Sequence, residues 1–163
     1  MWSPDRRALL GLGLLGLAGC GFTPAYGPGG PAAGLQGAFR LDDPTDKNGF
    51  DFVERMEERL GKSGAERYEL TYAIATKVSG VGQRRDNTIT RYNIVGTIDW
   101  GVVDIASGRR LTGGTATNFT AYSATGSTVA GLAAEEDANY RLMRILADQI
   151  VTRLTATAGS WHA

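Results

Sequence analysis

The stretch Thr88–Asp104, TITRYNIVGTIDWGVVD, decides the fold of this chain. Apolar and polar residues alternate along it, a pattern that indicates a β-strand with one face buried and the other in solvent. At about 3.3 Å per residue, a strand of this length exceeds the width of a small domain. We therefore expect a bulge or bend at Gly96 or Gly101. The side chains predicted to share the buried face are Tyr92, Ile94, Ile98, Trp100 and Val102.

Further strands are predicted on both sides of this stretch. Arg67–Val78 alternates in the same way and is followed by a polar, glycine-containing loop at 79–87. A turn at 106–110 leads into the threonine-rich return strand Leu111–Tyr122. Short turns between successive strands favour antiparallel neighbours. A short first strand is predicted within Gln36–Leu41.

Two segments have helical periodicity. Asn48–Leu60 repeats apolar residues at helical spacing, and Asp46 or Asn48 can cap its start. A second helix is predicted from Ser127 or Thr128 to Gly159. Its predicted apolar stripe is Leu132, Tyr140, Met143, Ala147, Ile150 and Leu154. The resulting order, β-α-β-β-β-α, predicts an α+β fold: a two-layer sandwich with an antiparallel four-stranded sheet and two helices on one face.

The N-terminus has the features of an export signal. Arg6 and Arg7 precede the uncharged, apolar run Ala8–Ala18, which is too short to span a bilayer. The paired arginines also weakly resemble a twin-arginine export signal, so both this route and the general secretory route stay open. Within the run, Gly11–Gly16 (GLGLLG) matches a dinucleotide-binding fingerprint, but no strand can precede it and no long helix can follow it.

The stretch Leu17–Cys20 (LAGC) resembles a bacterial lipobox, with small residues between leucine and cysteine. The resemblance implies cleavage before Cys20, lipidation of its sulfur and acylation of its amine. The alternative is an ordinary signal peptide with a stray cysteine. Cys20 is the only cysteine in the chain, and lipidation explains a lone thiol in an oxidising compartment. An aspartate directly after the lipidated cysteine would resemble an inner-membrane retention signal. This chain has Gly21 at that position, which favours sorting to the outer membrane.

These features divide the chain into three parts. Residues 1–19 are the predicted lipoprotein signal peptide, and residues 20–35 are a predicted lipidated tether rich in glycine and proline. Residues 36–163 form the predicted single α+β domain. The mature chain would carry 15 basic and 16 acidic residues, so its overall charge indicates no nucleic-acid partner.

Composition also limits the chemistry. His162 is the only histidine and lies next to the C-terminus, which argues against a histidine–cysteine metal site and against a serine–histidine–aspartate triad. Glu135, Glu136 and Asp137 are adjacent acids that could be imagined as a catalytic or metal cluster. The simpler interpretation is that acids are favoured near the start of a helix. Glu136 lies nearest the predicted apolar stripe.

Basic side chains are the candidate ligand-binding residues. Two arginine pairs stand at predicted turns, and planar guanidinium groups suit phosphates. Successive hairpins would place the two pairs at opposite ends of the sheet, and the simpler interpretation is ordinary solvated loop charge. Two strand residues on the face opposite the apolar side chains could assist. The candidates are Arg84, Arg85, Arg109 and Arg110 at the turns, with Lys77 and Arg91 on the strands.

Three stretches together resemble one known family. Cys20–Gly27 (CGFTPAYG) resembles the C-G-F-x-P-x-Y-G start of the LPS-assembly lipoprotein LptE family. Asn118–Ser123 (NFTAYS) is similar to its fourth strand. Ala134–Ala138 (AEEDA), running into Leu146–Leu154 (LADQIVTRL), is similar to its C-terminal helix. The family's fold is an α/β sandwich, in agreement with the element order.

This resemblance implies an outer-membrane lipoprotein that sits inside the barrel protein LptD. Such a protein plugs the barrel, helps it assemble and binds lipopolysaccharide during transfer to the cell surface. No enzyme activity and no cofactor are implied. The alternative is a periplasmic accessory lipoprotein of a lipid-transport ABC system. A lipid-anchored hydrolase lacks a nucleophile–base pair in this sequence.

Overall fold

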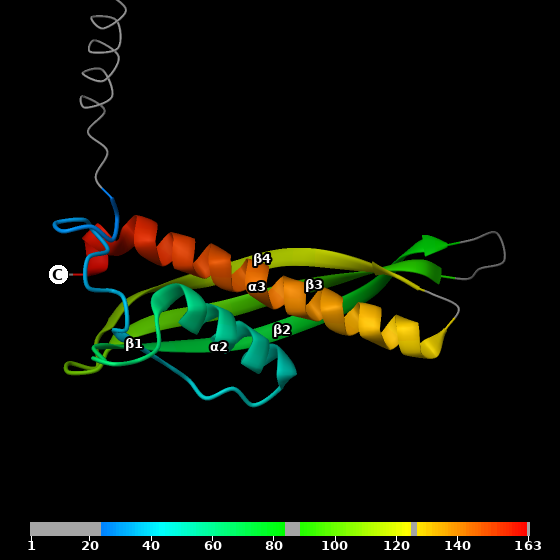
Figure 1. The fold of residues 1–163 in the computed structure, drawn as a ribbon, viewed down its shortest axis with the longest axis horizontal. Helices are drawn as coiled ribbons and strands as arrows, with labels where there is room; N and C mark the ends of the chain where they lie inside the picture. The colour runs from blue at the N-terminus through cyan, green and yellow to red at the C-terminus, as the bar shows by residue number, and fades with distance from the viewer. Residues whose placement is uncertain (1–23, 84–88, 125–126, 163) are drawn as a thin grey trace, which may run out of the picture.

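The computed structural model describes residues 24–83, 89–124 and 127–162. Two helices lie across one face of a four-stranded sheet (Figure 1), which confirms the predicted two-layer arrangement. The predicted element order, β-α-β-β-β-α, is also confirmed. The elements are β1 (Phe39–Leu41), α2 (Lys47–Leu60), β2 (Tyr68–Gln83), β3 (Ile89–Asp104), β4 (Arg110–Ser123) and α3 (Thr128–Trp161).

The sheet is mixed rather than wholly antiparallel. Its strand order is β1-β2-β3-β4, and both the β2–β3 and β3–β4 pairs are antiparallel as predicted. The short edge strand β1 instead pairs parallel with β2, with Phe39 opposite Tyr68. The reason is the connection: α2 carries the chain back to the end of the sheet where β1 began, so β2 runs in the same direction.

The pairing register contains no bulge at Gly96 or Gly101, so the predicted bulge was wrong at these positions, and the predicted bend stays a prediction. The register of β2 on β3 is regular through both glycines and shifts only beyond Gly80. The β3–β4 pair has a shift of its own between Val102 and Val103. Residues 79–83, predicted as loop, continue β2.

Gly96 has a packing role instead. A Cβ atom at Gly96 would lie 2.9 Å from Leu146 Cδ1 and 3.0 Å from Leu142 Cδ2. Contacts this short are below the normal van der Waals distance, so a side chain at this position would displace both leucines. The glycine therefore leaves room for Leu142 and Leu146 of α3 to pack against the middle of β3.

The hydrophobic core fills the space between the sheet and the helices. Thr120 is buried within it and donates from its hydroxyl to the Ala138 carbonyl at 2.9 Å. Leu132, predicted as part of the apolar stripe of α3, is 63% exposed because it lies near the start of the helix, ahead of the buried residues. The largest fully buried side chains are Tyr68, Phe39, Phe52, Leu35, Met56, Leu60, Leu70, Ile94, Ile98, Leu142, Met143 and Leu146.

An ion-pair network joins the two helices. Arg55 of α2 donates to both carboxylate oxygens of Asp148 on α3, each at 2.9 Å. Arg55 and Arg144 also approach Glu58, at 2.8 and 3.1 Å, and hold the pKa of that carboxyl below its ordinary value. The bidentate geometry fixes the position of α2 relative to α3 more firmly than a single contact would.

The helix ends agree with the predictions in part. Asp46 caps α2, as predicted, and its Oδ1 accepts from the Gly49 amide at 2.7 Å. Helix α3 begins at Thr128 but passes Gly159 and ends at Trp161. Trp161 is held by contacts with Phe39 and Tyr68, at ring-centroid distances of 6.3 and 5.5 Å, which explains why the helix continues past the glycine.

The N-terminal segment is packed rather than free. Residues 20–35 were predicted as a tether rich in glycine and proline, yet Ala32 and Leu35 are fully buried in the core. Successive turns position these two side chains, with hydrogen bonds such as Ala32 N to Ala25 O at 2.9 Å. From Pro24 onward, the predicted tether therefore belongs to the folded domain.

The packing at Gly96 gives the first prediction. Gly96→Val is expected to lower the free energy of unfolding by about 2 kcal/mol, because the added side chain overpacks the contact with α3. Chemical denaturation monitored by circular dichroism measures the change. The matched control is Ala75→Val, which adds bulk to an exposed position on the neighbouring strand. Equal stability of the two variants would show that α3 does not depend on the glycine.

Candidate functional site

One face of the sheet is left uncovered by the helices, and we call it the open face. Even-numbered side chains of the central strands, such as Ile98 and Trp100, point toward α2 and α3 and are buried. Because side chains alternate along a strand, the odd-numbered residues point to the opposite side. The open face comprises Thr71, Ala73, Ala75, Lys77, Arg91, Asn93, Val95, Thr97, Asp99, Gly113, Thr115, Thr117 and Phe119.

The open face is smooth and nearly uncharged at its centre. Thr115 donates to Asp99 Oδ1, and the hydroxyls of Thr97 and Thr117 lie 3.4 Å apart. These cross-strand contacts hold short side chains flat against the sheet. From Leu111 to Ser123, edge strand β4 carries no charged residue. A flat surface of small side chains can approach another backbone closely.

Two larger apolar side chains interrupt this flatness. Val95 and Phe119 are opposite each other in the β3–β4 register, and 39% and 61% of their respective surfaces are exposed. Neither side chain contributes to the core. A paired valine and phenylalanine facing outward on an otherwise polar face provide the apolar centre of a contact surface.

A shallow pocket lies near one end of the open face. Arg110 extends across the sheet there, and its guanidinium occupies the space that a Cβ atom at Gly113 would need. Gly101, opposite Gly113 in the register, forms the floor of the pocket. Thr71, Ala73 and Asp99 of the open face also line it, together with Val103. This pocket was not predicted from the sequence, because it depends on the strand register that brings Gly101 opposite Gly113.

The structure separates the predicted basic residues into two groups. Arg109 and Arg110 lie at the β3–β4 turn, beside Gly159 to His162 at the end of α3. Lys77 and Arg91 lie toward the other end of the sheet on the open face, both exposed. Lys77 is opposite Val95, four residues from Arg91 along β3, or about 13 Å. The two groups are therefore not one patch.

The other predicted arginine pair is not placed by the structure. Arg84 and Arg85 lie outside the described residues. The prediction that the two arginine pairs lie at opposite ends of the sheet therefore stays a prediction. What the structure does show is that Lys77 and Arg91 are on the face opposite the buried side chains, as predicted.

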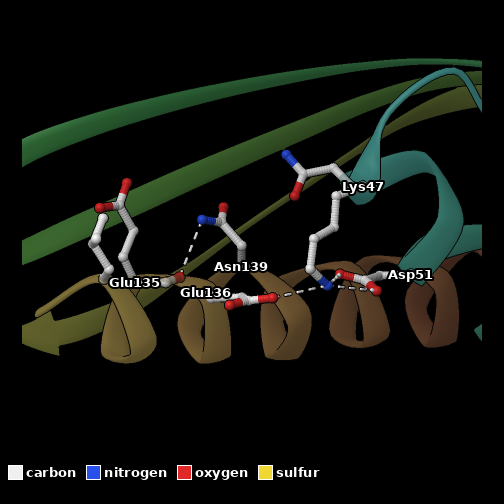
Figure 2. A pocket seen from close by; sticks show the side chains of 7 residues that line it. Lys47, Asp51, Glu135, Glu136 and Asn139 are labelled. Atoms are coloured by element: carbon white, nitrogen blue, oxygen red, sulfur yellow. Dashed lines mark hydrogen bonds and ion pairs between the residues drawn. The ribbon is translucent and has the colours of Figure 1, made fainter. Parts of the chain in front are cut away.

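The acidic triplet has a structural role. Asp137 accepts from Arg141 at 2.8 Å, and Glu136 lies 3.5 Å from Lys47 of α2. Figure 2 shows Lys47 between Glu136 and Asp51, bridging the two helices at the rim of a pocket. This supports the interpretation that these acids stabilise the helices. Within the described part of the chain, no group of three or more acidic, histidine or cysteine residues is arranged to hold a metal ion.

Solved structures define the class of protein to which this fold belongs. A candidate lipoprotein from Caulobacter crescentus CB15 matches with a TM-score of 0.67 at 20% identity, over 81% of this chain and 98% of that one. Rare lipoprotein B from Shewanella oneidensis matches with a TM-score of 0.55 at 12% identity, over 74% and 93% of the two chains. A minor lipoprotein from Acinetobacter baumannii matches with a TM-score of 0.55 at 16% identity, over 73% of this chain and 89% of that one. The fold is therefore that of small bacterial lipoproteins.

The family follows from the sequence match. The model of the family described as LptE, lipopolysaccharide-assembly, matches residues 38–154, and the chain belongs to this family. It is a family of non-enzymatic lipoproteins of lipopolysaccharide assembly. No curated protein matches the chain in a sequence comparison. Among the described residues, no helix has both the length and the apolar character needed to cross a membrane.

The open face should be dispensable for folding. Phe119→Ala is expected to change the free energy of unfolding by less than about 1 kcal/mol, because Phe119 loses only a cross-strand contact. Ile98→Ala, the control on the buried face of the adjacent strand, should lose about 2–5 kcal/mol. Urea denaturation of the isolated domain compares the two. A loss at Phe119 as large as that at Ile98 would mean that the open face is covered in the free protein.

Proposed function

We propose that this chain is an outer-membrane lipoprotein, anchored through Cys20, that plugs and helps assemble the LptD barrel and binds lipopolysaccharide during its transport to the cell surface. The observation that carries the proposal is the family match across residues 38–154, which covers the sheet and most of α3. The structure adds a surface suited to enclosure. Each part of the proposal is supported by a different feature of the chain.

The open face supports enclosure by a barrel. A plug has to lie against a wall on several sides without exposing a large apolar patch before assembly. The threonines and glycines of β4 meet this requirement, while Val95 and Phe119 give a small apolar contact area. Enclosure would bury far more than the roughly 1,600 Å² of a standard protein–protein interface.

The elongated shape also supports this role. Helix α3 has 34 residues, which corresponds to a length of about 50 Å. A bilayer including its headgroup regions is about 40–45 Å thick. A domain built along this helix is long enough to occupy the lumen of a barrel from one membrane surface to the other.

Cations on the domain surface support lipopolysaccharide binding. The ligand carries phosphates, and guanidinium groups form forked, charge-assisted hydrogen bonds with them. The described candidates are the turn pair Arg109 and Arg110 and the open-face pair Lys77 and Arg91, all exposed. Arg84 and Arg85 remain candidates on the sequence alone.

Co-purification tests the partner. From solubilised Gram-negative membranes, the full-length lipoprotein should co-elute with an outer-membrane barrel identified by mass spectrometry. Phe119→Asp should reduce the recovered barrel severalfold, because a charge at the centre of the open face would be desolvated in the complex. The control is Phe50→Asp, since Phe50 of α2 is equally exposed but lies outside the open face. Recovery of an inner-membrane ABC transporter instead would favour the alternative function.

Lipidation of Cys20 has its own test. Mass spectrometry of the mature protein should find cleavage before Cys20 and acyl chains on the new N-terminus. Cys20→Ala should carry no acyl chains and still fold, because the buried core begins at Ala32. An unmodified Cys20 in the membrane fraction, or cleavage at another position, would contradict the lipobox prediction.

Lipopolysaccharide binding is expected to depend on only one end of the sheet. We compare the double variants Arg109→Gln/Arg110→Gln and Lys77→Gln/Arg91→Gln, with Arg84→Gln/Arg85→Gln as a third. One variant should weaken binding severalfold and another hardly at all, because a single ligand headgroup cannot reach both ends. Affinities measured at two salt concentrations show whether the contact is electrostatic. Unchanged affinity in all three would assign these residues to ordinary surface charge.

A further inference from the structure

The N-terminal segment is fixed to the domain at several points, and we call residues 24–35 the strap. Tyr26 Oη lies 2.8 Å from Thr155 Oγ1 of α3, and Leu35 is fully buried. His162 Nε2 lies 2.8 Å from the Ala33 carbonyl, which can only accept, so Nε2 carries the proton. The other ring nitrogen, Nδ1, lies 2.7 Å from the hydroxyl oxygen of Tyr68. The last residues of the chain thus clamp the strap to a buried tyrosine.

The strap lies at one end of the elongated domain, together with two other segments. The β3–β4 turn borders the end of α3, since Arg109 and Arg110 line one pocket with residues 159–162. Pro31 of the strap approaches Gly159 from the other side. Figure 1 shows the strap, this turn and the C-terminus at the same end of the sheet. We define the anchor pole as residues 24–35, 105–110 and 159–162.

The distance from the lipid anchor to this pole is short. Only four residue steps separate Cys20 from Pro24, where the packed segment begins, and four residues span at most about 14 Å. A free tether ending at residue 35 would have allowed the domain to stand well away from the membrane and rotate. Because the strap is docked, the anchor pole has little freedom to leave the membrane surface.

We propose that the anchor pole rests on the lipid headgroups, so that the strap sets both the distance and the orientation of the domain on the membrane. This inference rests on the proposed lipidation of Cys20. The surface of the pole suits a lipid interface: the side chains of Tyr26 and Ile105 are 42% and 39% exposed, and Arg109 of the same pole is also exposed. Tyrosine and arginine are favoured at headgroup level.

The long axis of the domain then points away from the anchored leaflet. The β2–β3 hairpin and the start of α3 lie at the other end, about 50 Å away by the length of α3. Lys77 and Arg91 are therefore held far from the anchored surface, whereas the turn that carries Arg109 is held against it. Arg109 of the β3–β4 turn would lie at the lipid headgroups, and the basic residues of the open face would lie away from them.

Fluorescence quenching in vesicles tests this orientation. The full-length, lipidated chain is reconstituted into vesicles of phosphatidylethanolamine and phosphatidylglycerol that contain a headgroup-attached quencher. Since lipidation occupies Cys20, a fluorophore can be placed at Ala106→Cys in the anchor pole or at Ser79→Cys near the distal hairpin. Both positions are exposed. We expect quenching at position 106 to be at least threefold stronger than at position 79.

A variant of the linker shows whether the docked strap causes the difference. Fifteen glycine and serine residues inserted between Thr23 and Pro24 leave every strap contact intact but add a flexible span of about 20 Å. The insertion should reduce the contrast between the two positions at least twofold. Equal quenching at both positions, or a contrast that the insertion does not change, would overturn the inference.

The same samples separate this inference from the proposed function. Flotation with the vesicles and the mass of the acylated N-terminus report lipidation directly. A chain that lacks acyl chains and does not float contradicts the proposed anchor, and the inference fails with it. A chain that is acylated and floats but shows equal quenching leaves the anchor standing and contradicts only the orientation.

Discussion

The packing of α3 across β4 and β3 is the interaction that holds the helical layer on the sheet, and Gly96 leaves room for it in the middle of β3. Leu142 and Leu146 reach the sheet there because the glycine has no side chain. Helix α2 is then joined to α3 through Arg55 and Asp148. Both helices are consequently held on the same face, and the entire hydrophobic core lies between them and the sheet. The open face of the sheet is left uncovered by the helices.

The sequence predicted those parts of the fold that depend on local periodicity. Alternation in Thr88–Asp104 and helical spacing in Asn48–Leu60 identified the elements and their order. Local patterns in the sequence could not predict features that depend on contacts between segments far apart in the chain. The parallel pairing of β1 is set by where α2 returns the chain, and burial of Leu35 depends on the end of α3. Composition alone made that segment look like a free tether.

The candidate site was predictable to a similar extent. Alternation correctly placed Lys77 and Arg91 on the face away from the core. The pocket beneath Arg110 was missed, because it depends on the register that brings Gly101 opposite Gly113. The family match agrees with the resemblance seen at the N-terminus and in β4. Together, a one-sided core, an open face of small side chains and a docked N-terminal strap are the features on which the proposed function rests.

The central claim is that the open face contacts a partner in the membrane. Site-specific photo-crosslinking in living Gram-negative cells tests it most directly, with the photoreactive residue at Ala75 or Thr117. Both positions are exposed on the open face and lie outside the core. The account predicts an adduct with an outer-membrane barrel from at least one position. A folded, lipidated chain that gives no adduct from either position, or an adduct only with an inner-membrane transporter, would contradict it.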